Sequence, residues 1–341
     1  MNKFLFTTST ILSIIFCSCA QKNKLAIYNW TYYIPAPILE AFEKEYKTEI
    51  IYDEFTSNEE MFAKIKAGGA SWDLVFPSSD YVSIMIKENM LQKIDKSKIP
   101  NLKNIDSRVL QHITGDPFME YSVPYYWGAS CIIVNKQYVS SFQKDWTLFE
   151  RSDLFKRMTM LDDMREVMGA ALLHLGYSVN SKNEKEIEQA ANLITQSWKP
   201  NLVKFDSASF SKGYSLGDFW VIQAYPAGVY EEIKDDAALL ENTEFFIPQS
   251  GCPAYIDSMC ILSGARNEAA AQSFINFIHR PQVYAEFCRA FKFPSTVNKE
   301  ARSLLNEKTL YTLDDIFRLE VKSDLGASFS LWSEKWFTAI R

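Results

Sequence analysis

The chain has 341 residues, of which 47% are hydrophobic and 14% aromatic, so it can bury one large core or, more readily, two cores of ordinary domain size. Its formal net charge at pH 7 is −6, and it contains no long cluster of Lys and Arg. Because phosphate contacts need a basic face, this charge pattern argues against a nucleic-acid-binding protein and is more compatible with a cationic ligand.

The start of the chain has the layout of a secretion signal, with one Lys before an apolar run from Phe4 to Phe16. This run is too short to span a bilayer comfortably. Residues 1–19 resemble a bacterial lipoprotein signal, in which a Cys after a small residue, here Cys19 after Ser18, becomes lipidated. The alternative is an ordinary cleaved signal with incidental cysteines. We therefore expect an exported, periplasmic protein that a lipid anchor holds at a membrane.

The cysteines after this segment do not have the spacing of a metal site. They are Cys131, Cys252, Cys260 and Cys288. Each lies in an apolar setting, so we expect small buried core residues, with a Cys252–Cys260 disulfide as a less favoured alternative. The sequence predicts no metal site and no cofactor, and no later segment is apolar enough to be transmembrane.

The first part of the chain alternates strands with helices. Strands are expected at 24–30, 49–55 and 73–76, and helices at 35–46, 58–68 and 79–88. Ser57 and Glu60 have the spacing of a capping box for the second of these helices. This alternation predicts a mostly parallel sheet that helices cover on both faces.

The alternation resumes after residue 130 and predicts a second α/β unit. Strands are expected at 131–135, 157–161, 202–205 and 218–224, and helices at 165–174 and 185–196. A strand at 257–262, helices at 267–280 and 282–291, and a helical tail follow this unit. No Gly/Ser/Pro-rich hinge separates the two units. The chain should therefore cross between lobes through ordered segments near 127–131 and near 250, leaving a cleft that hinge bending can close.

Aromatic rings and carboxylates gather near the expected strand ends, where ligands bind in open α/β sheets. The candidate residues are Trp30, Thr31, Tyr33, Ser78, Ser79, Asp80, Asp163, Glu166, Trp220, Tyr255 and Asp257. An ammonium group is attracted both to aromatic faces and to carboxylates. Sugar sites rarely need several carboxylates, and anion sites would use Arg, Lys or bare helix N-termini.

Each candidate also has an ordinary structural interpretation. Asp163 and Glu166 have the spacing of an N-cap and an N3 residue, and either acid can stabilise the helix dipole. Trp30 and Trp220 can simply pack at strand ends, and Asp257 can be a solvated acid at a strand entry. One of these residues alone would therefore indicate little.

Several ordered segments resemble the bacterial spermidine/putrescine-binding proteins of ABC uptake systems. They include LAIYNWTYYIPAPILEAFEKEY, SNEEMFAKIKAGGASWDLVFPSSDYV, MLQKIDKSKIPNLKNI, YSVPYYWGAS, LDDMREVMGAALLHLGYSVN, DSMCIL, FINFIHRPQVYAEF and FPSTVN. The similarity runs from about residue 24 to the C-terminus. It implies a two-lobed periplasmic-binding-protein fold of type II, with a polyamine in the interlobe cleft and a permease and an ATPase as partners.

The resemblance also implies lobe boundaries and residue roles. One lobe would comprise 20–128 and 252–298, and the other 129–251 and 299–341. In the family pattern, Trp30, Thr31 and Tyr33 match the NW-x-x-Y residues, and Ser78 and Ser79 match the PS loop. Asp163 and Glu166 match acids that clasp amine nitrogens, Trp220 matches an aromatic wall, and Tyr255 and Asp257 match an aromatic residue and an acid at the start of DSMCIL.

Three positions depart from the family pattern and bear on ligand preference. Tyr32 replaces an acid that is usual in the family, Asp80 occupies a position that is often aromatic, and Lys322 occupies a neutral amide position. Asp80 could therefore serve as a relocated counter-ion for the far amine, or could be an exposed acid that the helix dipole favours.

Catalysis is the least favoured function. The three histidines, His112, His174 and His279, lie in or beside apolar helical segments, and no HExxH, GxSxG or phosphate-loop motif is present. The sequence therefore predicts a binding protein rather than an enzyme. A binding protein for another small cationic ligand, or a surface adhesin with the same fold, stays open as an alternative.

Overall fold

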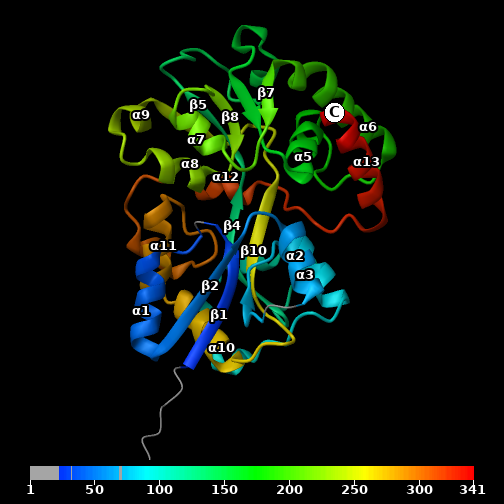
Figure 1. Cartoon of the computed structure of the whole chain (residues 1–341). Coiled ribbons are helices and arrows are strands. Elements are labelled where there is room, and N and C mark those ends of the chain that lie inside the picture. Colours follow the sequence, from blue (N-terminus) through cyan, green and yellow to red (C-terminus); the bar gives the residue numbers. More distant parts are fainter. Residues whose placement is uncertain (1–22, 32, 69–70) are drawn as a thin grey trace, which may run out of the picture.

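The computed structural model describes residues 23–31, 33–68 and 71–341. It has two lobes, each built around a five-stranded sheet with helices on both sides (Figure 1). The expected signal with Cys19, and also Tyr32, lie outside the described residues. Within the described residues, no helix is both long enough and apolar enough to cross a membrane.

The first lobe contains the sheet with strand order β2-β1-β3-β10-β4. These strands are β1 (Asn23–Trp30), β2 (Thr48–Phe55), β3 (Leu74–Val75), β4 (Ser122–Ala129) and β10 (Ala254–Ile261). β1 pairs in parallel with β2 and β3, whereas β10 is antiparallel to both β3 and β4.

The second lobe repeats this pattern with the order β7-β6-β8-β5-β9. Its strands are β5 (Cys131–Asn135), β6 (Met158–Met160), β7 (Leu202–Phe205), β8 (Val221–Ala224) and β9 (Thr243–Phe246). β6 is parallel to β7 and β8, whereas β5 is antiparallel to β8 and β9. The two-lobed fold is as expected, but the expectation of mostly parallel sheets is wrong. A buried strand reads as an apolar run in either direction, so the sequence pattern does not report strand direction.

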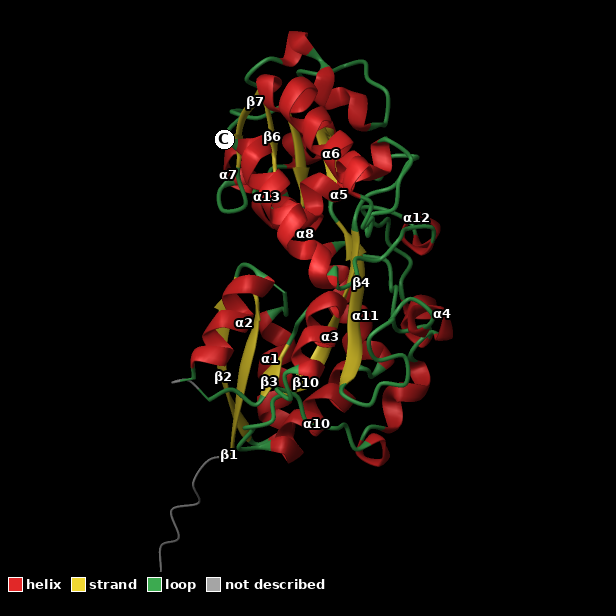
Figure 2. Cartoon of the chain, turned by 90° about the vertical axis from the view of Figure 1, so that its right-hand side faces the viewer, coloured by secondary structure: helices red, strands yellow, loops and turns green. Residues whose placement is uncertain are grey.

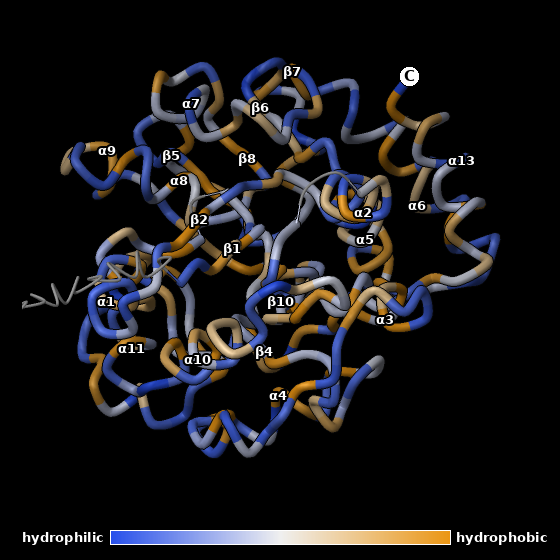
Figure 3. The backbone as a smooth tube through the Cα atoms, turned by 60° about the horizontal axis from the view of Figure 1, so that its bottom comes forward, coloured by the Kyte–Doolittle hydropathy of each residue, from blue (hydrophilic) through white to orange (hydrophobic). Residues whose placement is uncertain are grey.

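Helices cover both faces of each sheet. In the first lobe they are α1 (Ala36–Tyr46), α2 (Asn58–Ala67), α3 (Ser79–Lys87), α4 (Ser107–Leu110), α10 (Glu268–Ile278) and α11 (Pro281–Phe291). In the second lobe they are α5 (Met164–His174), α6 (Glu184–Leu193), α7 (Phe210–Ser215), α8 (Pro226–Ile233), α9 (Ala237–Asn242) and α13 (Phe329–Ile340). Hydrophobic stretches follow the inner strands, and many outer turns are hydrophilic (Figure 3).

The start of α2 shows how local sequence sets these elements. The Ser57 hydroxyl accepts the Glu60 N–H at 3.1 Å, as an N-cap does. The Glu60 carboxylate accepts the backbone N–H of Thr56 at 3.0 Å, one residue before the cap. The expected capping box is therefore half formed, at the start of a helix that lies in the first lobe on the side of the second (Figure 2).

The chain passes between the two sheets at Ser130, which joins β4 to β5, and returns between β9 and β10. A third connection is the C-terminal part of the chain. The turn Glu300–Leu304 packs on α11, and Arg302 forms an ion pair with Asp106 at 2.6 Å. The helix α12 (Leu313–Phe317) contacts β4, whereas α13 packs on α5 and α6. Residues 299–317 therefore pack on the first lobe, in contrast with the expected assignment of 299–341 to the second.

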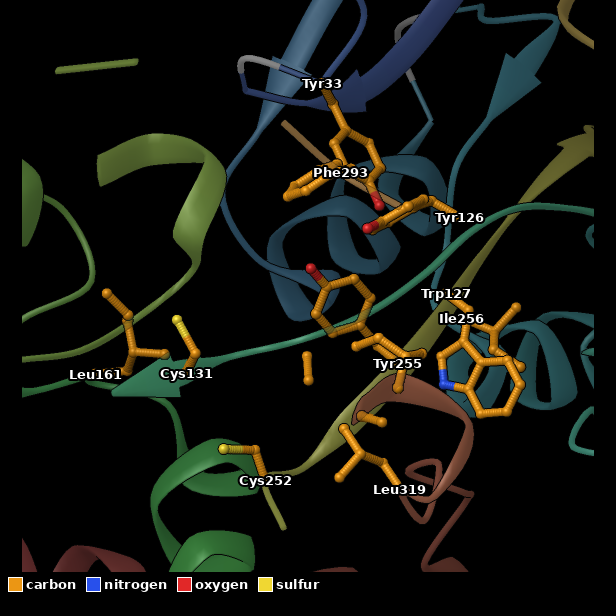
Figure 4. Packing of buried hydrophobic residues seen from close by; sticks show 14 of the residues in the cluster. Tyr33, Tyr126, Trp127, Cys131, Leu161, Cys252, Tyr255, Ile256, Phe293 and Leu319 are labelled. Atoms are coloured by element: carbon orange, nitrogen blue, oxygen red, sulfur yellow. The ribbon is translucent and has the colours of Figure 1, made fainter. Parts of the chain in front are cut away.

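The apolar core continues from one lobe to the other through the crossing segments. The cysteines in it, Cys131, Cys252, Cys260 and Cys288, are buried free thiols. The expectation of buried core cysteines is confirmed, and the Cys252–Cys260 disulfide is not formed. Figure 4 shows Cys131 and Cys252 as separate thiols on the crossing segments.

Candidate functional site between the two lobes

Asp257 is the most buried acid that the first lobe places in the space between the lobes, with 3% of its surface exposed. It lies inside β10, at an irregularity in the register with β4, whereas it was expected to be the first residue of the strand. Such irregularities re-aim a side chain. Its Oδ1 accepts the Ser78 hydroxyl at 2.6 Å, and its Oδ2 accepts the Tyr33 hydroxyl at 2.7 Å. Burial raises the pKa of Asp257 to about 7, although these two hydrogen bonds act to lower it.

The PS loop brings three further polar residues to the same place. Ser78 precedes α3, and its hydroxyl is used by Asp257 and by the Asn58 amide rather than for capping. Ser79 donates weakly to the Lys322 carbonyl at 3.4 Å. Asp80 lies in the first turn of α3 and is buried, so the alternative of a merely exposed acid is wrong. Its Oδ1 has no hydrogen-bond partner among the described residues.

Trp30 and Thr31 lie at the carboxyl end of β1, beside the ends of β2 and β3. The Trp30 indole donates to the Phe76 carbonyl at 2.8 Å, and its ring packs on Phe55. The Thr31 hydroxyl donates to the Phe55 carbonyl at 3.4 Å. Both side chains are half-buried, so the backbone of neighbouring strands fixes their position at the edge of the site.

Asp163 faces this group from the second lobe. It is the N-cap of α5, where its Oδ1 accepts the N–H groups of Arg165 at 2.8 Å and Glu166 at 3.1 Å. The capping role predicted from the sequence is therefore confirmed. Its other oxygen, Oδ2, lies 3.5 Å from the Tyr225 hydroxyl, so one carboxylate oxygen stays available on the side of the first lobe.

Glu166 lies in the first turn of α5 and is fully buried. Its Oε2 accepts the hydroxyl of Ser130, the residue of the first crossing, at 2.7 Å. Its Oε1 forms a buried ion pair with the Lys322 ammonium group. Burial raises the pKa of Glu166, and the charge of Lys322 opposes this effect. Burial acts to lower the pKa of Lys322, but the attraction of Glu166, Asp163 and Asp80 prevails and raises it.

Two tyrosine rings complete the site between the acids. The rings of Tyr255 and Tyr225 meet nearly perpendicular, with centroids 6.0 Å apart. Gly128 lies opposite Tyr255 on β4, where an added Cβ would come within 2.7 Å of the Tyr255 hydroxyl. The glycine therefore leaves room for the ring, which stands inside the packing of Figure 4 with Tyr126 to one side.

The expectation that Trp220 forms part of this site is wrong. β8 begins at Val221, so Trp220 lies at the amino end of the strand, where its N–H donates to the Arg157 carbonyl at 2.7 Å. Its ring stacks on the Tyr138 ring, and the Arg157 guanidinium group lies over the Trp220 ring. β8 runs parallel to β6, and Asp163 follows the carboxyl end of β6. The site is therefore at the carboxyl end of β8, whereas Trp220 lies at the amino end.

Sequence reasoning missed Tyr225 and Glu59. Tyr225 directly follows β8, whose end at residue 224 was expected correctly, so the rule that ligands bind at carboxyl ends could have found this residue. Glu59, in the first turn of α2, accepts the Tyr81 hydroxyl at 2.9 Å. Burial raises the pKa of Glu59, and the charges of Asp163 and Asp80 raise it further. The first turn of α2 in one lobe is therefore near Asp163 of the other.

The site thus combines carboxylates from both lobes with hydroxyls and aromatic rings. The carboxylates are Glu59, Asp80, Asp163, Glu166 and Asp257. In the described part of the chain no group of His, Cys, Asp and Glu is arranged to hold a metal ion. An organic cation with hydrogen-bond donors fits this arrangement, because carboxylates accept charge-assisted hydrogen bonds and the rings attract positive charge.

Residues 38–310 match the family model of the bacterial extracellular solute-binding proteins. The chain belongs to this family. It is 36% identical to the spermidine/putrescine-binding periplasmic protein of Escherichia coli over 92% of this chain and 90% of that protein. It is 30% identical to the putrescine-binding periplasmic protein SpuD of Pseudomonas aeruginosa, over 87% and 88% of the two chains.

Solved structures give the same fold for this solute-binding protein. The Tp0655 (TpPotD) lipoprotein of Treponema pallidum superposes with a TM-score of 0.90 at 48% identity, over 93% of this chain and 99% of that one. A putative spermidine/putrescine ABC transporter protein of Listeria monocytogenes superposes with a TM-score of 0.82 at 31% identity, over 93% and 98%. The two lobes of the solute-binding protein therefore correspond to those of known periplasmic binding proteins.

Proposed function

We propose that this solute-binding protein captures a polyamine between its lobes and delivers it to the permease and ATPase of an ABC uptake system. The observation that carries the proposal is the set of buried and half-buried carboxylates that the two lobes direct at one another beside tyrosine rings. The names of the relatives from Escherichia coli and Pseudomonas aeruginosa support it, since both are polyamine-binding proteins.

The geometry suits a ligand with a positive charge at each end. Asp80 and Asp257 lie on the first lobe, Asp163 lies on the second, and Tyr255 and Tyr225 lie between. A carboxylate about 4 Å from an ammonium group gains roughly 4 kcal/mol at an effective dielectric constant near 20. A flexible diamine can reach both lobes at once and so stabilise the closed arrangement.

The proposed ligand contacts come from both lobes. They are Trp30, Thr31, Tyr33, Ser78, Ser79, Asp80, Asp163, Tyr225, Tyr255 and Asp257. Glu166 belongs to the same cluster, but the Lys322 ammonium group already balances its charge, whereas the partners of Asp257 are the neutral hydroxyls of Ser78 and Tyr33. Trp220 is not proposed as a contact, because it lies at the far end of β8.

Isothermal titration calorimetry with putrescine, spermidine and spermine tests the proposal. At least one of them is expected to bind with a Kd near or below about 1 µM, which corresponds to about 8 kcal/mol. An amino acid and thiamine serve as controls and should give no heat. The absence of both heat and thermal shift with all three amines would refute polyamine binding.

Asp163 offers a test that separates its capping from its proposed ligand contact. Asn is about as good an N-cap as Asp, whereas Ala costs about 1 kcal/mol of stability. Asp163→Asn should therefore keep the melting temperature of the ligand-free protein and still weaken polyamine binding by about tenfold or more, which is about 1.4 kcal/mol. Asp163→Ala should lower both. An unchanged affinity of the Asn variant would show that Asp163 only caps α5.

We further propose that Cys19 is lipidated and holds the protein at a membrane in the periplasm. The signal-like sequence supports this, as does the similarity to a protein of Treponema pallidum described as a lipoprotein. Mass spectrometry of the purified mature protein should find a lipid-modified N-terminal cysteine. An unmodified N-terminus at another residue would contradict the anchor.

A further inference from the structure

Both lobes hold the segment Glu320–Asp324, which runs between them. The Lys322 N–H donates to the Ala254 carbonyl at 2.8 Å, next to β10. The Ser323 carbonyl accepts the Arg165 guanidinium group of α5 at 2.9 Å. Asp324 forms an ion pair with Lys87 of α3 at 2.7 Å. The backbone of this segment is therefore fixed relative to both lobes. The position from which the Lys322 side chain extends is fixed in the same way.

The Lys322 side chain reaches from this segment into the site. It is 7% exposed, and its ammonium group pairs with Glu166 and lies 5.8 Å from the centroid of the Tyr255 ring. A carboxylate and an aromatic ring are the two partners that an alkylammonium ligand would use. The chain thus places its own primary ammonium group among the residues that face the ligand.

The Lys322 ammonium group determines which carboxylates of the site are free to bind a ligand. Glu166 is fully buried and has one oxygen on Lys322 and the other on Ser130, so a ligand amine would have to displace Lys322 to reach it. Asp80 Oδ1 has no partner among the described residues, and Asp163 Oδ2 has only the distant Tyr225 hydroxyl. These two oxygens lie on opposite lobes, and each can take one end of a ligand.

We propose that Lys322 is a built-in ammonium group that fills one amine position of the site, so that the protein prefers a ligand with two amines over one with three. This inference rests on the proposed polyamine binding and concerns its specificity. A third ammonium group would have to displace Lys322 or lie beside it, and two like charges at about 4 Å in a site shielded from water repel strongly. A diamine meets its two carboxylates without this repulsion.

The first test measures specificity. In wild-type protein, putrescine should bind at least tenfold more tightly than spermidine. Lys322→Gln removes the charge and leaves Glu166 open to the third amine, so the ratio of the spermidine Kd to the putrescine Kd should fall at least tenfold. Lys87→Gln is the matched control, because it removes an exposed lysine that pairs with Asp324 on the same segment. It should leave the ratio within twofold, and a ratio equally unchanged in Lys322→Gln would overturn the inference.

The second test asks directly whether an ammonium group belongs in this position. Lys322→Ala removes the atoms of propylamine, so added propylammonium should bind the variant saturably and raise its melting temperature. Wild-type protein should show no such shift, and neither should the double variant Glu166→Gln/Lys322→Ala. A Lys322→Ala protein that propylammonium does not stabilise, or that stays unfolded in its presence, would overturn the inference.

The two tests separate the inference from the proposed function. If wild-type protein binds no polyamine while propylammonium still stabilises Lys322→Ala, the proposed function fails, and with it the preference for two amines. The ammonium position itself would then stand. If wild-type protein binds polyamines but both tests with Lys322 variants are negative, the proposed function stands and the inference fails.

Discussion

Replacing Glu166 with Gln is expected to lower the free energy of unfolding of the ligand-free protein by about 3 kcal/mol, the low end of what breaking a buried ion pair costs. The reason is that the variant leaves the buried Lys322 ammonium group without its counter-ion. Asp163 and Asp80 also attract Lys322 and recover part of the loss. Urea unfolding followed by fluorescence measures the effect.

Variants of the partner show whether this loss comes from the ion pair. Lys322→Met should cost less than Glu166→Gln, because burial raises the pKa of Glu166 and the acid can take up a proton. The double variant Glu166→Gln/Lys322→Met should be more stable than Glu166→Gln alone, because it contains neither charge. A Glu166→Gln protein within about 0.5 kcal/mol of wild type, the range of ordinary surface substitutions, would show that the pair does not contribute.

Polyamine affinity is expected to fall about thirty-fold between pH 8.5 and pH 5.5. Burial raises the pKa of Asp257 to about 7 in the ligand-free protein. The bound ligand needs the carboxylate, and at pH 5.5 only about one molecule in thirty carries it, so binding must release a proton. The ligand amines, with pKa values near that of Lys at about 10.4, stay charged throughout. Calorimetric Kd values across this pH range test the expectation.

Asp257→Asn is the control for this pH dependence. Its affinity should be weak and nearly constant from pH 5.5 to 8.5, because the titrating group is gone.

The free energy of unfolding of the ligand-free protein should depend on pH in the opposite sense to the polyamine affinity, so that it falls as the pH rises. Since the folded-state pKa of Asp257 is raised, its contribution is present at low pH and is lost as the pH rises through about 7. As the pH rises from about 4, the unfolded-state value, to about 7, the ligand-free variant should therefore lose less stability than wild type. A wild-type affinity that does not change with pH would contradict the role of Asp257.

Several parts of the site follow from local sequence. Asp163 caps α5 because its short acid precedes a helical segment, and its free oxygen then points beyond the helix end. Trp30, Thr31, Ser78 and Asp80 were found because they lie at or shortly after the ends of apolar strands. Where a strand ends is a local property, so these positions could be predicted without the fold.

Other features depended on where a buried strand begins and on its direction. An apolar pattern does not report the strand direction. Asp257 was expected to be the first residue of a strand, but β10 begins at Ala254 and the acid lies within it. Trp220 and Tyr225 stand at opposite ends of β8, and only the parallel pairing with β6 shows that Tyr225 is on the side of the site. The expectation of mostly parallel sheets was wrong for the same reason. The strands that connect the lobes run antiparallel to their neighbours, and the apolar pattern does not show this direction.

By itself, the sequence determined the two α/β units, the acids and rings at strand and helix ends, and the resemblance that led to the family. Only the tertiary structure decided how those groups are paired. Tyr33 and Asp257 are 224 residues apart, and Lys322 and Glu166 are 156 apart, yet each pair is in direct contact. The first contact arises because β10 is inserted into the sheet of the first lobe, and the second because the C-terminal segment packs between the two lobes. Burial makes each charge depend on its partner, and no local pattern encodes these contacts.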